Sequence, residues 1–525
     1  MTPPALTSHL GTPSPLPFET VAGRVAKHAA ERPDATAVID DQRRISYAEL
    51  NDLADRIAAS LQRDGIAPQQ AITICAASRI EYLAVFVGAL RAGVVVVPIA
   101  PGSTPAQTAA MVQDSGAKLL FVDAKTTATL EPVISARGVP QVALDNQGPR
   151  PFEGWLAAAG TRPTAVEIDP AWAFNIIYSS GTTGTPKGIV QPHGMRWAQA
   201  MRAAGSGYGP DSVALISTPL YSNTTLVVVI PTLVMGGALA LMARFDALRY
   251  LERAQELRMT HTMLVPVQYA RLMALPAFGQ FDLSCTQAKF CSSAPFHAEL
   301  KAEVLKRWPG GLTELYGMTE GGGSCILAAH LHPDKLHTVG QPAMGNVILL
   351  IDESGRPVAQ GETGEIVGRS ASMMIGYHGQ PGKTREAEWY DEGGERYIRT
   401  GDIGRFDADG FLTLLDRKKD MIITGGFNVH PSDLEAVLRA HPDVLDCAVI
   451  GVPSAAWGET PVAAVVLRAD APDDTAGIRD WSNARLGKTQ RLSAVLAVDE
   501  LPRSAIGKIL KRELREQWES LSGIS

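Results

Sequence analysis

Residues 71–123 alternate short apolar strands with an apolar helix, and this rhythm restricts the fold more than any other feature of the chain. The runs AITIC (71–75), VVVVPI (94–99) and KLLFVD (118–123) have strand length, and EYLAVFVGALRAG (81–93) reads as a helix. Strands that are apolar on both faces and alternate with helices are typical of a covered parallel sheet. The rhythm returns at 213–243 and 259–265. We therefore predict an α/β fold with mostly parallel, layered sheets.

The segment ISYAELNDLADRIAASLQRDGI at 45–66 predicts an amphipathic helix. Ser46 and Glu49 have the spacing of a capping box, in which each residue satisfies a backbone N–H at the start of the helix. Leucine and isoleucine residues recur on one face, and Gly65 is a typical stop signal.

A charge-free segment, LVVVIPTLVMGGALALM at 226–242, is barely long enough to cross a bilayer. It contains Pro231 and the pair Gly236-Gly237, and no basic clusters flank it. We interpret it as a buried helix, a glycine turn and a buried strand rather than a membrane span.

The sequence pattern changes after about residue 345, where the predicted strands become shorter and turn residues become more frequent. VILLIDESGRPV, GEIVGR and GRFDADGFLTLLDR suggest antiparallel hairpins. After residue 420 a compact α+β pattern begins, with a helix from Pro431. We place a domain boundary at 416–420, which predicts a large domain over 1–416 and a small one over 417–525.

Composition excludes several classes of protein. The chain has 525 residues, is 45% hydrophobic and 20% charged, and carries a net charge of −7 without a long basic run. This describes a globular protein and argues against a nucleic-acid-binding surface. Five cysteines without a CxxC pair favour a reducing compartment, and no signal peptide is evident, so we expect a cytoplasmic location. The histidines of HLHPDKLH at 330–337 lack companion ligands and read as a surface loop.

The run YSSGTTGTPKG at 178–188 follows the strand-like AFNIIY and has no apolar periodicity, so it predicts a loop. Its glycines allow the backbone to approach a ligand, and successive N–H groups with hydroxyls can surround phosphate oxygens. The GxxxxGK[ST] pattern of a P-loop fails, because Pro186 precedes Lys187 and a glycine follows it. A flexible linker and a Ser–Lys amidase remain alternative interpretations.

Three further polar segments follow in a set order. LTELYGMTEGGG (312–323) contains Glu320, a carboxylate that could lie beside phosphates only with a bridging cation such as Mg²⁺. In YIRTGDIGRFDADGFLTLLDRKKD (397–420), Asp402 ends a predicted turn and could accept ribose hydroxyls, with Arg417 near it. In LPRSAIGKILKRELR (501–515), Lys508 lies between a strand and a basic helix. Taken singly, each charge could also be a solvated surface group.

Together these motifs, in this order, resemble those of the adenylate-forming enzymes, a superfamily of acyl- and aryl-CoA synthetases, peptide-synthetase adenylation domains and firefly luciferase. The similarity runs from SYAEL (46–50) to GKILKR (507–512), nearly the whole chain. It implies a large N-terminal domain that includes a distorted antiparallel barrel, and a small mobile α+β C-terminal domain. It also implies a carboxylic acid substrate, with ATP, Mg²⁺ and coenzyme A as cofactors; a homodimer is left open.

The resemblance further implies a nucleotide site. Its phosphate loop would contribute Ser179, Ser180, Gly181, Thr182, Thr183, Gly184 and Lys187. The adenine would lie against Ser293, Ala294, Pro295, Tyr316 and Gly317. Thr319 would contact the α-phosphate, Glu320 would hold Mg²⁺, and Asp402 with Arg417 would bind the ribose.

In the same family, a lysine at the position of Lys508 bridges the attacking carboxylate and the α-phosphate. Lys419 matches the hinge about which the small domain turns, and Gly425 with Gly426 would leave a tunnel for the pantetheine of coenzyme A. A catalytically silent AMP-binding protein is a further alternative, but it would not need Lys508 and Glu320.

The acid and its acceptor are less constrained. The acid pocket would include Tyr221, Ser222, Met318, Gly321 and Gly322. Small residues after Glu320 and the apolar segment at 226–231 favour an aryl or other bulky hydrophobic acid, although the glycines could equally serve backbone geometry. Many CoA ligases have, at the position of Ser222, a His that borders the substrate carboxylate. That role therefore does not carry over to Ser222. The alternatives are a medium- or long-chain fatty acid, and a stand-alone adenylation protein that loads a carrier protein.

Overall fold

The computed structural model describes residues 17–134, 138–148, 150–179, 187–424, 427–454, 456–487, 490–504 and 507–521. The chain divides into two compact units. The first comprises Met1–Leu336, Pro342–Ile348 and Gly368–Ile398, and the second comprises His337–Gln341, Leu349–Val367 and Arg399–Ser525. This division by compactness differs from the predicted boundary at 416–420, which concerns the part that turns during a reaction and stays a prediction.

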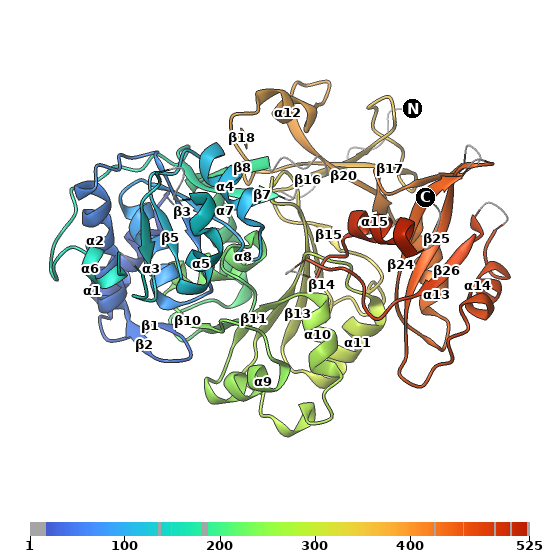
Figure 1. Cartoon of the computed structure of the whole chain (residues 1–525), viewed down its shortest axis with the longest axis horizontal. Coiled ribbons are helices and arrows are strands. Elements are labelled where there is room, and N and C mark those ends of the chain that lie inside the picture. The colour runs from blue at the N-terminus through green and yellow to red at the C-terminus, as the bar shows by residue number, and fades with distance from the viewer. Residues whose placement is uncertain are drawn as a thin grey trace. The chain divides into compact units, whose positions relative to one another are not determined.

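A seven-stranded sheet forms one half of the first unit (Figure 1). The pairs β3–β4, β3–β5, β5–β6 and β4–β7 are parallel, whereas β7–β8 and β8–β18 are antiparallel. The strand order is β18 (Gly376–Tyr377), β8 (Lys187–Pro192), β7 (Ala173–Ser179), β4 (Val95–Pro98), β3 (Ala71–Cys75), β5 (Leu120–Val122) and β6 (Gln141–Ala143).

A nine-stranded sheet forms the other half of the first unit, and its central pairs are also parallel. Its order is β15 (Gln341–Pro342), β14 (Cys325–Ala328), β13 (Gly311–Tyr316), β12 (Ala288–Cys291), β11 (His261–Leu264), β9 (Val213–Ile216), β10 (Ala238–Leu241), β1 (Thr36–Ile39) and β2 (Arg44–Ser46).

Helices lie between the two sheets and on their outer faces, which gives the layers that the alternation of strands and helices predicts. One hydrophobic core joins alternate residues of both sheets to α1 (Val21–Glu31), α2 (Tyr47–Arg63), α3 (Ile80–Arg91) and α8 (Asn223–Met235). A second core packs α4 (Pro105–Asp114) and α5 (Ala124–Ile134) on the opposite face of the seven-stranded sheet. The opposite face of the nine-stranded sheet carries α9 (Ala247–Glu256), α10 (Pro266–Met273) and α11 (Ala298–Arg307).

Local sequence signals account for the interior helices. The predicted capping box of α2 is present, with Ser46 Oγ accepting from the Glu49 N–H and the Glu49 carboxylate accepting from the Ser46 N–H. The apolar segment 226–242 contributes α8, a left-handed Gly236 and the buried β10, so the predicted helix, turn and strand are confirmed. Within the described residues, no helix combines the length and the apolar character that crossing a membrane requires.

A five-stranded sheet corresponds to the predicted hairpins and distorted barrel. Its order is β16 (Val347–Ile351), β17 (Thr363–Arg369), β20 (Arg396–Phe406) and β19 (Glu388–Tyr390), with β21 (Leu412–Arg417) also pairing with β20. Both β19 and β21 are antiparallel to β20. The prediction of a turn at Thr400–Asp402 is wrong, because these residues lie inside β20. Gly401 has φ 71°, a conformation that glycine tolerates. The TGD sequence therefore marks a local irregularity within the strand.

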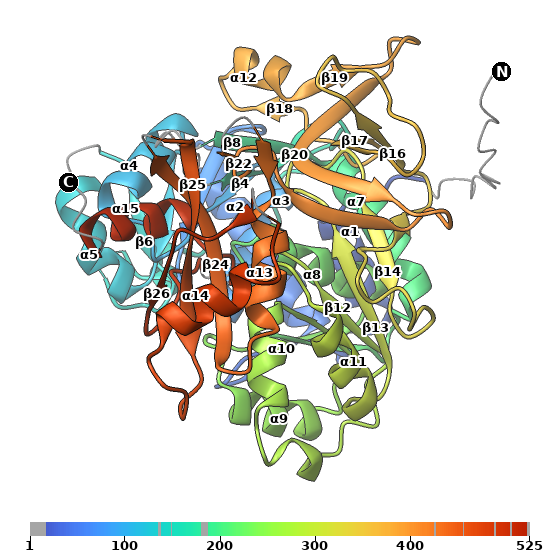
Figure 2. The same cartoon turned by 90° about the vertical axis from the view of Figure 1, so that its right-hand side faces the viewer.

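The second unit contains a mixed sheet in the order β23 (Phe427–Val429), β22 (Ile422–Thr424), β25 (Gly458–Leu467) and β24 (Val444–Ser454), with β26 (Ala494–Ala497) parallel to β25. Helices α13 (Pro431–Arg439) and α14 (Thr475–Asn483) cover one face, and α15 (Lys511–Leu521) packs on the other (Figure 2). The remaining helices are α6 (Phe152–Trp155), α7 (His193–Ala203), α12 (Pro381–Glu386) and the 3₁₀ turns η2 (Ala204–Ser206) and η3 (Phe278–Gln280).

Candidate active site

The ends of two neighbouring strands frame the predicted phosphate loop. Strand β7 ends at Ser179 and β8 begins at Lys187, and these two residues are antiparallel partners. The Tyr178 hydroxyl donates to Asp114 Oδ2 at 2.5 Å, which ties the end of β7 to α4. The phosphate-loop residues predicted between the strands, Ser180, Gly181, Thr182, Thr183 and Gly184, lie outside the described residues.

Tyr377 connects two of the predicted site residues in the first unit. Its ring centroid lies 5.2 Å from Lys187 Nζ, and its hydroxyl donates to Glu320 Oε1 at 2.8 Å. Burial, followed by the Glu320 carboxylate, raises the pKa of Tyr377 well above its ordinary value, so the phenol remains a donor at neutral pH. The structure thus brings Lys187 to the ring and Glu320 to the hydroxyl of one tyrosine that the sequence did not single out.

The segment carrying Thr319 and Glu320 follows β13 and is held by backbone hydrogen bonds. The Met374 N–H donates to the Glu320 carbonyl at 2.8 Å, and the Gly322 N–H donates to the Ser372 carbonyl at 3.1 Å. These bonds fix the direction in which the Glu320 carboxylate leaves the backbone.

Glu320 fits the chemistry of a magnesium ligand. In the described part of the chain, no three His, Cys, Asp or Glu side chains cluster as a metal site would need. Mg²⁺ at nucleotide sites is usually held by one or two carboxylates together with substrate phosphates and water, so a single carboxylate is enough. The assignment of Glu320 to the metal stays a prediction.

Close packing explains the glycine run after Glu320. A Cβ on Gly321 would lie 1.9 Å from the Ser372 carbonyl oxygen, and one on Gly323 would lie 1.9 Å from Ile348 Cδ1. Gly321 and Gly322 also have φ of 76° and 88°. Backbone geometry therefore accounts for these glycines, and they no longer argue for a bulky acid; the pocket role of Gly321 and Gly322 stays a prediction.

Gly321→Ala should lower the free energy of unfolding by about 2–4 kcal/mol, because it combines a left-handed alanine with a backbone clash. Gly345→Ala is the matched control, since Gly345 has the same φ of 76° but no atom within 4 Å of an added Cβ. Urea unfolding of both variants separates the clash from the φ strain. Equal losses in the two variants would contradict the packing explanation.

Five of the predicted adenine and acid-pocket residues lie just before α8 or just after β12. Ser293 has φ 81°, a strained conformation for a residue other than glycine, and its hydroxyl contacts that of Thr224 at 2.5 Å. Ser222 is the buried N-cap residue of α8. Ala294 and Pro295 follow Ser293, and Tyr221 precedes Ser222.

The remaining predicted contacts of this unit continue from β13. Tyr316 is the last residue of β13, and Gly317 is exposed. Met318 packs against a small apolar cluster that includes Ile189 and Tyr377. Burial raises the pKa of Tyr221, so its phenol stays protonated at neutral pH.

In the second unit, Asp402 and Arg417 are directly opposite each other on β20 and β21. Arg417 Nε lies 3.1 Å from Asp402 Oδ1, and the arginine remains 40% exposed. The pair can therefore present a carboxylate oxygen and guanidinium N–H groups to one ligand, as the predicted ribose contact requires.

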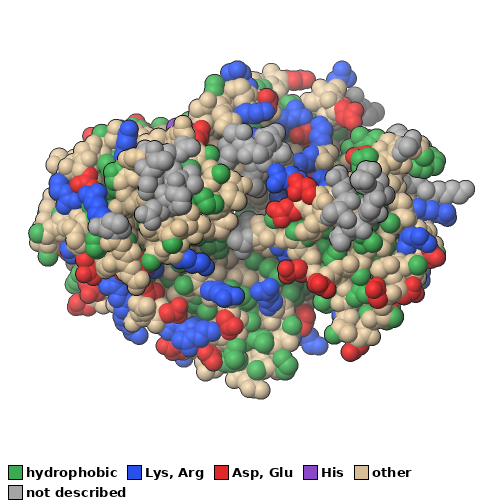
Figure 3. Space-filling model, viewed as in Figure 1, with side chains coloured by type: hydrophobic (Ala, Val, Ile, Leu, Met, Phe, Trp, Pro, Cys, Tyr) green, Lys and Arg blue, Asp and Glu red, His purple; other side chains and the backbone are tan. Residues whose placement is uncertain are grey.

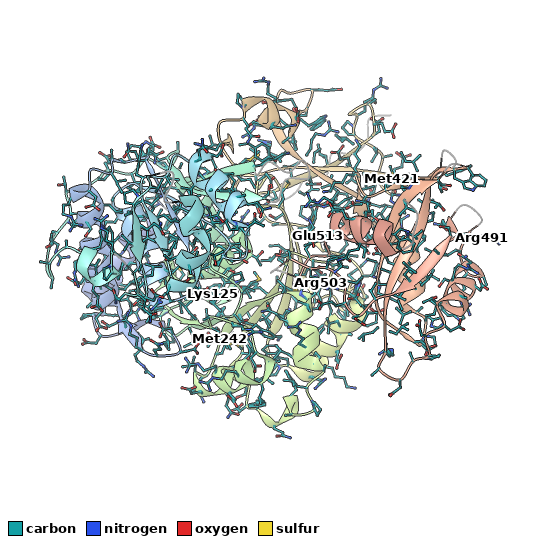
Figure 4. The ribbon with its side chains drawn as sticks, in the orientation of Figure 1. Lys125, Met242, Met421, Arg491, Arg503 and Glu513 are labelled. Carbon is teal, nitrogen blue, oxygen red and sulfur yellow. The ribbon has the colours of Figure 1, made fainter. Side chains whose placement is uncertain are left out.

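Lys508 lies in the second unit, three residues before the start of α15. Gly507 has φ 77°, and the Ser504 N–H donates to the Lys508 carbonyl at 2.9 Å. Arg503, labelled in Figure 4, donates to the Gly507 carbonyl at 2.7 Å. The Lys508 side chain reaches solvent, yet desolvation first and then the nearby Arg417 and Lys419 charges lower its pKa to about 8.

Ion pairs surround the predicted hinge. Lys418–Asp420 forms a turn after β21, in which the Asp420 N–H donates to the Arg417 carbonyl at 2.9 Å. Arg515 Nη2 bonds Asp420 Oδ1 at 3.2 Å, and Lys418 Nζ bonds Glu365 Oε2 at 3.1 Å. Lys419 is exposed in this turn. Gly425 and Gly426, the predicted tunnel residues, lie outside the described residues.

Tyr377 and the buried Gln191 contact predicted site residues, Glu320 and Thr319, although the sequence did not single them out. Tyr377 is 57 residues from its partner Glu320, and nothing local in MMIGYHG marks it. Gln191 left a weak signal, because it is a polar residue at a buried position of the apolar strand β8. On the face shown in Figure 3, acidic and basic side chains are interspersed.

Comparison with known proteins agrees with these motifs. The family described as "AMP-binding enzyme" matches residues 25–378, and "AMP-binding enzyme C-terminal domain" matches residues 433–508. A feruloyl-CoA synthase of Amycolatopsis sp is 32% identical over 497 residues, which cover 94% of this chain and 98% of that protein.

Two other similar proteins differ in their acceptors. The fatty acid–[acyl-carrier-protein] ligase ScoC of Streptomyces coeruleorubidus is 29% identical over 95% of this chain and 97% of its own. The structure of the amide bond synthetase McbA from Marinactinospora thermotolerans superimposes with a TM-score of 0.85 at 28% identity and covers 95% of this chain and 99% of that chain. The chain therefore belongs to the AMP-binding enzyme family, as an enzyme of the AMP-forming acid–thiol ligase type.

Proposed function

We propose that this enzyme joins an aryl or other bulky hydrophobic carboxylic acid to coenzyme A at the expense of ATP. The observation that carries the proposal is that Tyr377 contacts both Lys187, the last residue predicted for the phosphate loop, and the carboxylate of Glu320. A lone carboxylate beside a phosphate site is explained if it shares a divalent cation with the nucleotide.

The reaction has two balanced steps. First, a carboxylate oxygen attacks the α-phosphorus of ATP, a P–O bond to the β-phosphate breaks, and acyl-adenylate and pyrophosphate form. Then the coenzyme A thiol loses its proton to water and its sulfur attacks the acyl carbon, the bond from that carbon to the AMP oxygen breaks, and acyl-CoA and AMP form. The two steps place negative charge at different atoms, so different side chains must act in each.

Six of the predicted residues would act in the first step. Lys187 would neutralise the departing pyrophosphate, and Thr319 would donate to the α-phosphate. Asp402 and Arg417 would bind the ribose, and Lys508 would meet the charge that builds up between the carboxylate and the α-phosphate. Bound Mg²⁺ would neutralise phosphate charge, and Glu320 would hold it in place.

The hydrophobic character of the acid is supported by Met318 of the predicted pocket, which packs with Ile189 and Tyr377 in a small apolar cluster. The feruloyl-CoA synthase relative favours an aromatic acid. The ScoC relative favours the alternative of a fatty acid and a carrier-protein acceptor.

A panel of acids with and without acceptors tests the function. Pyrophosphate release is measured with Mg²⁺, ATP and each of ferulate, benzoate, octanoate and dodecanoate, and products are identified by mass spectrometry after addition of coenzyme A. We expect acid-dependent pyrophosphate release that is greatest with ferulate, and a CoA thioester as product. Pyrophosphate release that no acid increases would contradict the ligase function. Greatest release with dodecanoate would favour the fatty-acid alternative, and an adenylate that coenzyme A leaves intact would point to another acceptor.

A further inference from the structure

Arg196 is a fully buried cation on α7, and its hydrogen-bond acceptors among the described residues are side-chain amide oxygens. Its guanidinium donates to Asn175 Oδ1 at 3.3 Å, to Gln199 Oε1 at 2.9 Å and to Gln191 Oε1. The Phe174 ring centroid lies 5.8 Å away. Across the described part of the chain, no carboxylate forms an ion pair with Arg196, and burial alone lowers its pKa to about 9. Burying an unpaired charge is costly, so its retention calls for an explanation.

Gln191 links this buried cation to the segment that carries the predicted catalytic residues. A guanidinium has no acceptor, so only the oxygen of the Gln191 amide can face Arg196. The Nε2 group must therefore point the other way, where it donates to the Thr319 carbonyl at 2.6 Å and to Asn223 Oδ1 at 3.3 Å. A cation on the amide oxygen also polarises the amide and strengthens its N–H donors.

The bond to Thr319 completes the support of this segment. The next residue, Glu320, accepts from the Met374 N–H through its carbonyl and from Tyr377 through its carboxylate. The segment is thus held by residues 374 and 377 at Glu320 and by one glutamine side chain at Thr319. Gln191 is 128 residues from Thr319 and buried, so it cannot contact solvent in place of this carbonyl.

We propose that Arg196 and Gln191 are positioning residues for adenylate formation: Arg196 fixes the orientation of the Gln191 amide, and Gln191 holds Thr319 and Glu320 in place. The inference rests on the proposed function, in which Thr319 contacts the α-phosphate. It adds to that function two residues that touch no substrate and act through the carbonyl of Thr319.

Two matched variants separate positioning from charge. Gln191→Glu keeps an acceptor for Arg196 but replaces the N–H donors with an oxygen that repels the Thr319 carbonyl. Gln199→Glu puts the same carboxylate beside Arg196 without touching Thr319. A carboxylate next to a guanidinium stays ionised, so both variants neutralise Arg196 to the same extent.

Hydrogen exchange measures positioning without any substrate. The Gly321 and Gly322 N–H groups bond the carbonyls of Met318 and Ser372, so their exchange reports opening of this segment. In the full-length protein, we expect Gln191→Glu to accelerate exchange over residues 318–323 and to leave β7 unchanged, whereas Gln199→Glu should change neither. Accelerated exchange throughout β7 would indicate a general structural role and overturn the proposal, as would unchanged exchange over 318–323.

The two half-reactions provide the catalytic readout, with ferulate and dodecanoate as acids. We expect Gln191→Glu to lower kcat for pyrophosphate release roughly 10- to 100-fold, with a smaller change in KM for ATP. Thioester formation from a supplied acyl-adenylate should be unchanged, and Gln199→Glu should resemble the wild type in both assays. Equal losses in both half-reactions, or equal losses in the two variants, would overturn the proposal. A wild type that releases no pyrophosphate with any acid would refute the proposed function instead, and hydrogen exchange would still decide whether Gln191 positions the segment.

Discussion

Lys508→Ala should slow adenylate formation by about 10²–10³-fold, which is the usual loss when one preorganised group that stabilises transition-state charge is removed. The first step gathers negative charge between the attacking carboxylate and the α-phosphate, and alanine leaves that charge without its cation. The second step has no such build-up at this position. Thioester formation from a supplied acyl-adenylate should therefore proceed at close to the wild-type rate.

The measurement compares acid-dependent pyrophosphate release with thioester formation in single-turnover experiments. Arg512→Ala is the matched control, because Arg512 is an exposed cation of the same basic segment whose ion pair to Glu516 lies at the surface. It should leave both rates within about twofold, since exposed ion pairs contribute little. Equal losses in both half-reactions of Lys508→Ala would show that Lys508 does not act specifically in adenylation.

The lowered pKa of Lys508, about 8, gives this prediction a pH dependence. A lysine is a cation below its pKa and loses its charge as pH rises through it. Because kcat/KM reports groups of the free enzyme, kcat/KM for adenylation should decline as pH rises through about 8. A profile that stays flat from pH 7 to pH 9.5 would contradict an essential Lys508 cation.

Glu320→Gln should lower the adenylation rate by about 10²-fold or more. The substitution keeps the shape of the side chain but removes the charge proposed to hold Mg²⁺, and metal-borne charge stabilisation amounts to several kcal/mol. Raising the Mg²⁺ concentration should partly restore the rate of the variant. Loss of rate that does not respond to Mg²⁺ would separate Glu320 from the metal.

Tyr377→Phe tests the role of Glu320 with a smaller change. It removes only the hydroxyl that donates to Glu320 at 2.8 Å, so we expect a loss of roughly 10-fold, as for one hydrogen bond to a charged group. Tyr390→Phe is the control, since the exposed Tyr390 hydroxyl donates to Glu388 at 3.2 Å outside the proposed site. A loss in Tyr390→Phe as large as in Tyr377→Phe would show that the effect is unrelated to Glu320.

Much of the fold follows from local sequence. The capping box of α2, the buried strands β3, β4 and β5, and the helix, turn and strand at 223–241 lie close to where the pattern predicts them. These elements depend on caps, apolar periodicity and glycine turns within a few residues of one another. The TGD segment was predicted wrongly as a turn. Its glycine has a positive φ, as in many turns, but lies inside β20, and the local sequence does not distinguish the two cases.

The candidate site also combines residues that the local sequence reveals with contacts that only the fold creates. Motifs identified Lys187, Glu320 and Lys508, because their chemistry is written in short runs of sequence. No such run reveals that Gly321 is required by the Ser372 carbonyl. That requirement arises only when two distant backbone segments come into contact.

The sequence by itself determined the fold class, the family and the order of the charged motifs, since each depends on residues that are neighbours along the chain. Only the tertiary structure decided what holds those motifs. Tyr377 donates to Glu320, which is 57 residues away in the sequence. Gln191, whose amide is oriented by Arg196, donates to Thr319, which is 128 residues away. Both contacts exist because β8 and β18 pair in one sheet beside the loop after β13. A common polar side chain such as Tyr or Gln becomes a positioning group only where folding leaves it no other partner.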